Sequence, residues 1–291
     1  MDTSLALQAR IRAARSFDPA RYLKFDVDGA CIGYVRRDLA EHLRRFKNVF
    51  VLAESNVAFR PEVDTPADRS VAMASVARGL EAQGLLSRWR DETYDIRGAD
   101  DSAGLFKLER AAVRFFGFIA QAVHVNGLVA QGRAMSMWIA RRSADKAIDP
   151  GMLDNMVGGG VASGLSIRET LMKEAWEEAG IPAEIAATAH SVGSLCIRRE
   201  VPDGLHSEII HVHDLFLPPD FAPVNQDGEV AELHLSTLAD VLCEIQDGAR
   251  YTVDATLVAL DCLVRHGTLD ERWASAIHAP LPLTSSPGST L

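Results

Sequence analysis

Hydrophobic and polar positions alternate differently before and after residue 110. In the first part, longer stretches have the spacing of amphipathic helices, and short apolar runs at 31–35 and 49–52 indicate strands. The expected helices are Ser4 to Ser16, Arg36 to Phe46 and Pro66 to Leu86. The pattern therefore predicts an N-terminal α+β domain over residues 1–110 that is largely helical, with a small strand component.

After residue 110 the pattern favours strands. Phe115 to Val125 is expected to form a long strand, Asn126-Gly127 a turn, and Arg133 to Arg141 the returning strand of a hairpin. Residues 143–164 are dense in Asp, Pro and Gly, so they are expected to form a loop.

The remaining elements alternate between helices and strands. They are a helix from Ser166, strands at 191–200, 207–217 and 230–235, and helices at 236–245 and 253–265. This order predicts an α/β domain over residues 111–279, in which helices cover a mixed sheet on both faces. A Pro- and Ser-rich tail over 280–291 is expected to be loose.

Composition limits the kinds of partner. The chain has 291 residues, 47% of them hydrophobic, and a formal net charge of −10. Such a charge opposes binding to a nucleic-acid backbone or an anionic membrane, so neither is expected as a partner. Four cysteines lie apart without a C-x-x-C pair, which is typical of a reducing compartment, and no leader or long apolar run is evident. The expected location is the cytoplasm, and a homodimer is left open.

Three carboxylates on one predicted helix carry the chemistry. Glu174, Glu177 and Glu178 lie at positions i, i+3 and i+4, which share one helical face. Carboxylates crowded in this way repel one another unless a cation lies between them, and Mg²⁺ prefers such oxygen ligands. A glycine run at 158–160 precedes the helix, and Gly180 ends it.

This segment resembles the box of the Nudix (MutT-like) hydrolases, G-x5-E-x7-R-E-U-x-E-E-x-G-U with U apolar. Gly159 fits the first glycine, the three glutamates fit the metal-binding end, and Gly180 fits the last glycine. Two positions depart from the pattern, because Leu165 replaces a glutamate and Lys173 replaces the arginine. Glu169 lies four residues before Lys173, so we expect an ion pair that replaces part of the lost arginine contact.

The resemblance implies a Nudix α/β/α sandwich and a metal-dependent hydrolase. Mg²⁺ or Mn²⁺ would be held by Glu174, Glu177 and Glu178, with the backbone near Gly158 completing the shell, and Gly159 and Gly160 shaping the loop. The general base is left open among Glu177, Glu174 and the distal Glu229, which lies in an Asp-Gly-Glu segment before a strand.

Residues around the box suggest how a substrate is bound. Arg141, Arg142 and Lys146 would place positive charge beside the metal helix, and Trp138 offers a ring for stacking. His206, His211 and His213 suggest zinc, but zinc would need a third and fourth ligand there, and no cysteine except Cys196 is near in the sequence, so histidines of a partly exposed sheet are favoured.

The stretch 138–160 and the segment 227–230 resemble one Nudix branch more closely. That branch also occurs fused to fungal thiamine pyrophosphokinase and as separate plant and yeast proteins with a similar N-terminal extension. The resemblance implies hydrolysis of oxidised or damaged thiamine diphosphate to the monophosphate, with a small-molecule diphosphate as partner. The alternatives are a Nudix hydrolase of nucleoside diphosphate derivatives and a Nudix-fold module that binds a ligand without turnover.

Overall fold

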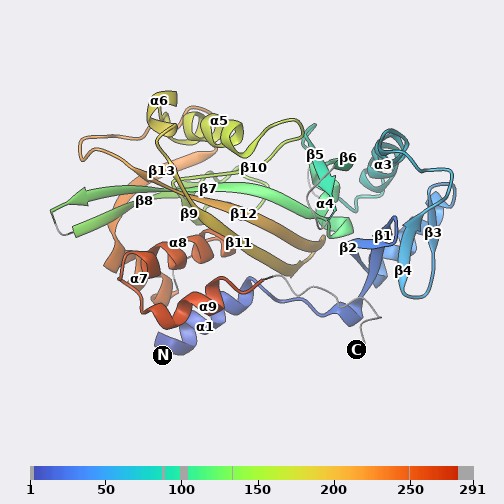
Figure 1. Ribbon diagram of the computed structural model, residues 1–291, viewed down its shortest axis with the longest axis horizontal. Helices are drawn as coiled ribbons and strands as arrows, with labels where there is room; N and C mark the ends of the chain where they lie inside the picture. Colours follow the sequence, from blue (N-terminus) through green and yellow to red (C-terminus); the bar gives the residue numbers. More distant parts are fainter. Residues whose placement is uncertain (1–2, 87–88, 99–103, 133, 249, 281–291) are drawn as a thin grey trace.

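The computed structural model describes residues 3–86, 89–98, 104–132, 134–248 and 250–280. Figure 1 shows two units side by side, with the larger sheet between two layers of helices and the smaller unit at one end of that sheet. In the described part, no helix is long and apolar enough to cross a membrane.

The larger unit is built on a seven-stranded sheet. The path of the sheet is β11 (His190–Val201), β12 (Gly204–Phe216), β7 (Ile119–Gln131), β8 (Ala134–Arg142) and β13 (Val230–Thr237). Off this path, β10 (Val157–Gly160) pairs with β7 and β9 (Leu153–Asn155) pairs with β8. Because β7 and β12 are parallel and the other pairs are antiparallel, the predicted mixed sheet is confirmed.

Helices cover both faces of this sheet, as Figure 1 shows. On one face lie α5 (Ile167–Ala179) and α6 (Ala183–Ala186), and on the other lie α1 (Thr3–Ala13), α7 (Leu238–Asp247), α8 (Val253–Arg265) and α9 (Ala274–Ile277), which follows the short turn η3 (Glu271–Trp273). The α/β/α sandwich is therefore confirmed. The helix predicted at 253–265 is confirmed at its bounds, and the one expected from Ser166 begins at Ile167.

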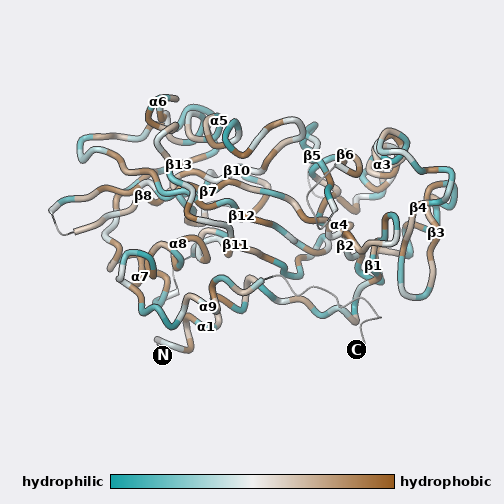
Figure 2. The backbone as a smooth tube through the Cα atoms, viewed as in Figure 1, coloured by the Kyte–Doolittle hydropathy of each residue, from teal (hydrophilic) through white to brown (hydrophobic). Residues whose placement is uncertain are grey.

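Alternation along the strands divides the core between the two faces. Val123 and Val125 of β7 pack in one cluster with Leu171 and Ala175 of α5. Leu128 instead packs in the cluster that contains the buried face of α8. In Figure 2 the hydrophobic stretches follow the sheet, whereas α5 is largely hydrophilic.

The smaller unit contains a four-stranded sheet in the order β2-β1-β4-β3 and a separate β5–β6 ribbon. Its elements are η1 (Pro19–Arg21), β1 (Tyr22–Val27), β2 (Ala30–Arg36), α2 (Arg37–Ala40), η2 (Glu41–Phe46), β3 (Phe50–Leu52), β4 (Asn56–Phe59), α3 (Pro66–Glu81), β5 (Thr93–Arg97), β6 (Gly104–Glu109) and α4 (Arg110–Phe116). The expectation of only a small strand component is wrong, because six described strands lie here and phenylalanines of β1, β3, β4 and β6 pack against one another.

The first helix does not pack with that unit. Leu7, Ile11 and Ala14 of the α1 region lie in the core cluster of α7 and α8. The chain therefore begins against the larger unit, crosses to the smaller one, and returns through α4 and β7.

The strand predicted at Phe115 to Val125 is wrong in its first part. Arg110 to Phe116 is a helix that ends at Gly117 with a positive φ of 59°, and β7 begins two residues later. Glu109 caps this helix by accepting from the Ala111 amide at 3.3 Å. The cap and the left-handed glycine together favour a helix over the strand propensity of the phenylalanines.

The turn predicted at Asn126-Gly127 is also wrong, because both residues lie inside β7. Asn126 is fully buried and donates to Asp214 at 2.9 Å, and a side chain at Gly127 would overlap the Met156 thioether. Long-range contacts therefore decide this segment against its turn propensity. The predicted loop 143–164 is corrected as well, since it contains β9 and β10.

The Gly117 bend supplies a stability prediction. Gly117 and Gly132 have similar positive φ values of 59° and 62°, but only Gly117 is confined, against the Tyr34 carbonyl. Both Gly→Ala changes incur the left-handed cost of about 1–2 kcal/mol. Gly117→Ala should lower the free energy of unfolding by at least about 1 kcal/mol more than Gly132→Ala, because the added Cβ meets backbone. Denaturant unfolding of both variants checks this, and equal losses would contradict the close approach.

Candidate active site

The box helix α5 is held at both ends by local contacts. Ser166 accepts from the Glu169 amide at 3.2 Å, and the Glu169 carboxylate accepts from the Ser166 amide at 2.8 Å, which forms a capping box. At the other end Gly180 adopts a φ of 62°, which glycine accepts without strain. The predicted role of Gly180 as the helix stop therefore has a clear geometric basis.

Two box carboxylates press against the glycine strand β10. Glu178 is 5% exposed and accepts from the Gly158 amide at 2.7 Å. Glu174 lies where a side chain on Gly159 would be, and the Tyr94 hydroxyl lies where one on Gly160 would be. The glycine run is therefore required because the carboxylates and a tyrosine approach its backbone closely.

Lysine ammonium groups neutralise these carboxylates. Lys173 donates to Glu174 at 3.0 Å and to Glu177 at 2.6 Å. Lys146 lies 3.6 Å from Glu178 and forms a close ion pair with the distal Glu229. Glu229 is thus brought next to the box although it is far away in sequence.

The expected ion pair between Glu169 and Lys173 is wrong. Glu169 is held by Ser166 through the capping box, whose short local contacts leave its carboxylate facing the helix start. Lys173 instead extends toward Glu174 and Glu177, so its charge serves the box itself.

Burial changes the protonation of the box. It raises the pKa of Glu178 to about 8, although Lys146 and the Gly158 amide oppose the shift. Burial also raises the pKa of Glu174, against the opposing effect of Lys173. Burial tends to lower the pKa of Lys173, but hydrogen bonds to Glu177 and Glu174 raise it overall.

The donor set has the chemistry that a hard divalent cation requires. Two of the three carboxylates, Glu174 and Glu178, lie against the glycines, and the contact of Glu174 with Gly159 leaves no room for another side chain. Among the described residues, however, the box glutamates are not in either group of three ligands whose atoms all lie within 4.8 Å of one another. Lys173 pairs with Glu174 and Glu177, and Lys146 with Glu178, so a bound cation would take over the neutralising role of these lysines.

A pocket with about 110 Å³ of room lies beside β10, lined by Gly158, Gly159 and Gly160. Its other charged and polar lining comes from both units: Arg90, Arg110, Arg114, His124, Arg142, Lys146, Asp149, Asp154, His206, Glu208, Glu229, Thr252 and Asp254. Lys146 and Glu229 connect this pocket to Glu178.

Of the four predicted substrate-binding residues, the structure brings two into this pocket. Arg142 and Lys146 line it, and Arg142 also pairs with Asp154 at 2.7 Å. Arg141 points elsewhere, toward Glu232 at 3.1 Å, because successive strand residues face opposite sides. Trp138 packs against the core beneath α5 and does not line the pocket.

Sequence reasoning missed the contribution of the smaller unit. Arg110 and Arg114 are on α4, and Arg110 pairs with Glu92 at 2.7 Å. Their spacing of four residues would have placed both on one face if the helix had been recognised. Because residues 115–125 were predicted to form a strand, the helix and the spacing of its arginines were not recognised.

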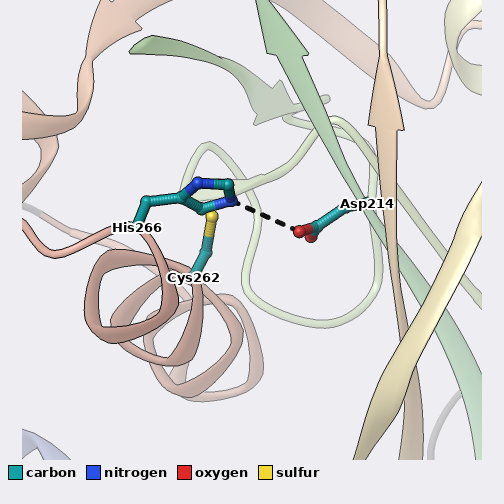
Figure 3. A group of neighbouring side chains, drawn as sticks. All are labelled: Asp214, Cys262 and His266. Atoms are coloured by element: carbon teal, nitrogen blue, oxygen red, sulfur yellow. Dashed lines mark hydrogen bonds and ion pairs between the residues drawn. The ribbon is translucent and has the colours of Figure 1, made fainter. Parts of the chain in front are cut away.

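Two groups of three potential metal ligands occur in the described residues, and one is already satisfied. Figure 3 shows His266 pointing to Asp214, with Cys262 beside them. Asp214 also accepts from Asn126 at 2.9 Å and pairs closely with Arg265. Burial raises the pKa of Cys262 far above its usual value, so the thiol stays protonated. Arg265 therefore provides the counter-charge, and this group is an internal ion-pair network.

The second group contains His206, Glu208 and Asp254, all on the pocket lining. The other two histidines considered for zinc bind protein groups instead, since His211 is 3.0 Å from Gln121 and His213 is 3.2 Å from the His211 carbonyl. The lack of a nearby cysteine other than Cys196 does not decide against a metal at His206, because two carboxylates lie close to it.

The raised pKa of Glu178 gives a pH prediction. The folded state binds a proton that the unfolded state releases above about 4.5, so this contribution to stability is present at low pH and is lost as pH rises toward 8. The melting temperature of the metal-free protein should therefore fall more between pH 5 and 9 than that of Glu178→Gln, whose neutral amide does not titrate. Thermal melts in a chelator measure both curves, and parallel curves would contradict the shift.

Comparison with known proteins shows which family this chain resembles. Residues 120–256 match the model of the NUDIX domain, and residues 4–120 match a domain of unknown function (DUF4743). The two models meet at the start of β7, whereas the boundary predicted at 110/111 falls at the start of α4.

Two curated relatives come from Arabidopsis thaliana. Nudix hydrolase 24, chloroplastic, is 33% identical over 250 residues, covering 85% of this chain and 68% of the relative. Nudix hydrolase 20, chloroplastic, is 34% identical over 263 residues, covering 84% and 68%. Among solved structures, DR0079 from Deinococcus radiodurans is 26% identical, covers 59% of this chain and 99% of that one, and has a TM-score of 0.47. The chain belongs to the Nudix hydrolases, enzymes that cleave diphosphate linkages and generally use divalent metal ions.

Proposed function

We propose that this Nudix hydrolase cleaves a small organic diphosphate, namely oxidised or damaged thiamine diphosphate, to the monophosphate with Mg²⁺ or Mn²⁺. The observation that carries the proposal is the pocket beside β10, where cationic residues of both units meet the glycine strand that the box carboxylates contact. Such a pocket suits the anionic end of a ligand.

Charge at the pocket favours an anionic ligand. Arg110 and Arg142 are each paired with one carboxylate, at 2.7 Å in both cases. Arg114 lines the pocket and has no ion-pair partner among the residues that the structure describes. An arginine without a protein carboxylate can donate to a phosphate oxygen in two places. Arg114 is therefore the proposed phosphate-binding residue of the smaller unit.

Cleavage needs a nucleophilic water and a stabilised leaving phosphate. A bound divalent cation would be held by Glu174, Glu177 and Glu178 with the backbone near Gly158, and would neutralise the diphosphate and acidify water. The chain itself supplies the proton acceptor, for which Glu174, Glu177 and Glu229 are the candidates. Glu229 is the one of these that lines the pocket.

The thiamine part of the proposal is supported by the sequence resemblance of residues 138–160 and 227–230 to the branch described above. Both segments lie at the pocket, since Arg142, Lys146 and Glu229 belong to them. The ring of the substrate would then contact residues further from the box.

A panel of diphosphates tests the substrate. The full chain is incubated with Mg²⁺ or Mn²⁺ and with thiamine diphosphate, its oxidised forms, or nucleoside diphosphate derivatives, and phosphate release is measured. The highest kcat/KM is expected with an oxidised thiamine diphosphate. Preference for a nucleoside derivative would replace the substrate assignment, and binding without any release would support a non-catalytic module.

Variants of the box test the chemistry. Glu177→Gln and Glu178→Gln should each lower kcat by about 100-fold or more, because each removes a negative oxygen next to the reacting phosphate. Glu184→Gln, on an exposed position of α6, is the matched control and should leave kcat unchanged. Wild-type turnover in either box variant would overturn the metal assignment, and melting curves show whether each variant is folded.

A pair of arginine variants tests the pocket. Arg114→Ala should raise KM by about tenfold or more, since a charge-assisted hydrogen bond contributes about 1.5–3 kcal/mol. Arg141→Ala removes the same charge outside the pocket and should leave KM close to the wild-type value. Equal effects of the two changes would show that general charge, rather than the pocket, attracts the substrate.

A further inference from the structure

His206, Glu208 and Asp254 converge from two elements on the α8 face of the sheet. His206 and Glu208 are two residues apart on β12, so their side chains share one face of the strand. Asp254 lies in the first turn of α8, two residues after its cap Thr252, which accepts from the Ala255 amide at 3.1 Å. Their ligand atoms all lie within 4.8 Å of one another.

Buried polar atoms in this group lack hydrogen bonds. His206 is 5% exposed, and its Nε2 atom and the Oδ1 atom of Asp254 are buried without a hydrogen-bond partner among the described residues. Leaving a buried polar atom unpaired costs about 1–3 kcal/mol, so such atoms point to a missing partner.

The distances fit a bridging cation better than a direct contact. His206 Nε2 is 3.5 Å from Asp254 Oδ2 and 3.7 Å from Glu208 Oε2. Hydrogen bonds from nitrogen to oxygen rarely exceed about 3.2 Å. Two ligands that each bind a tetrahedral ion at about 2.1 Å lie about 3.4 Å apart, which is close to both separations.

The surroundings leave this position without a protein cation that bonds to the group. Arg199 lies near Asp254, and Arg110 lies near Glu208. Neither makes a hydrogen bond to these carboxylates in the described part of the chain, since Arg199 pairs with Asp149 and Arg110 with Glu92. This differs from the Asp214 group, in which Arg265 bonds directly to the carboxylate.

We propose that His206, Glu208 and Asp254 form a second divalent-cation site, separate from the Nudix box. One imidazole nitrogen with two carboxylates is a donor set that suits Zn²⁺ or another transition-metal ion better than Mg²⁺. Three protein ligands leave a fourth position, and because all three residues line the pocket, that position faces the space proposed for the substrate.

The site differs from the box in ligand type. The box offers oxygen ligands, as a hard ion requires, whereas this site includes nitrogen. The assignment of the ion rests on His206, Glu208 and Asp254 and does not depend on which diphosphate is hydrolysed.

Cobalt provides a direct probe, because Co²⁺ replaces Zn²⁺ and its visible absorption reports coordination geometry. Titration of the full chain with Co²⁺ should give the intense bands of a tetrahedral site, which an all-oxygen octahedral box does not produce. Zn²⁺ should abolish the bands at one equivalent, and Mg²⁺ in excess should not.

Variants locate the ion. His206→Gln and Asp254→Asn should each weaken Co²⁺ binding at least tenfold, whereas His266→Gln, in the group of Figure 3, should leave the spectrum unchanged. If His206→Gln fails to fold by circular dichroism, Asp254→Asn, which is half-buried at a helix start, decides the outcome.

An unchanged Co²⁺ affinity in the Asp254→Asn protein, or the absence of tetrahedral bands from the wild type, would overturn the proposal. An inactive protein that still binds Co²⁺ through His206 would support the site while contradicting the proposed hydrolysis, so the two failures are distinguishable.

Discussion

The close packing of other groups on the three glycines of strand β10 is the constraint on which the site depends. Each of its glycines faces a different partner: His124 of the central strand at Gly158, Glu174 of the box helix at Gly159, and Tyr94 of the smaller unit at Gly160. A side chain at Gly159 or Gly160 would overlap Glu174 or Tyr94, and one at Gly158 would press on the His124 ring. The strand therefore fixes the box helix, the sheet and the smaller unit relative to one another within a few residues.

The charge state of the box carboxylates depends on this packing. Bringing Glu174 and Glu178 against a glycine backbone removes water from their carboxylates, which is costly for ionised groups. The Gly158 amide, Lys146 and Lys173 offset part of that cost. The replacement of the family arginine by Lys173 fits this role, because a single ammonium group on a flexible stem can contact both Glu174 and Glu177. Because the lysines offset only part of the cost of burying these carboxylates, a divalent cation at this position would stabilise them further.

Elements that neighbouring residues determine could be predicted from the sequence, whereas features that depend on contacts between distant residues could not. The box helix carries its own start and stop, Ser166 with Glu169 and Gly180, so its position followed from a few neighbouring residues. Asn126-Gly127 carried an equally strong turn signal, yet a buried partner in Asp214 and the contact with Met156 keep it extended. The same limit applies to Lys146 and Glu229, whose ion pair joins residues far apart in the chain.

The contribution of the smaller unit follows from the way the chain passes from one unit to the other. Helix α4 continues almost directly into β7, and the bend at Gly117 packs on the Tyr34 backbone. Gly204 packs against the carbonyl of Arg114, which joins the end of α4 to the start of β12. Arg110 and Arg114 are therefore fixed to the same strands that carry His124 and His206. Arg110 and Arg114 line the pocket from this junction, so the proposed preference for one diphosphate over another would depend on residues outside the box.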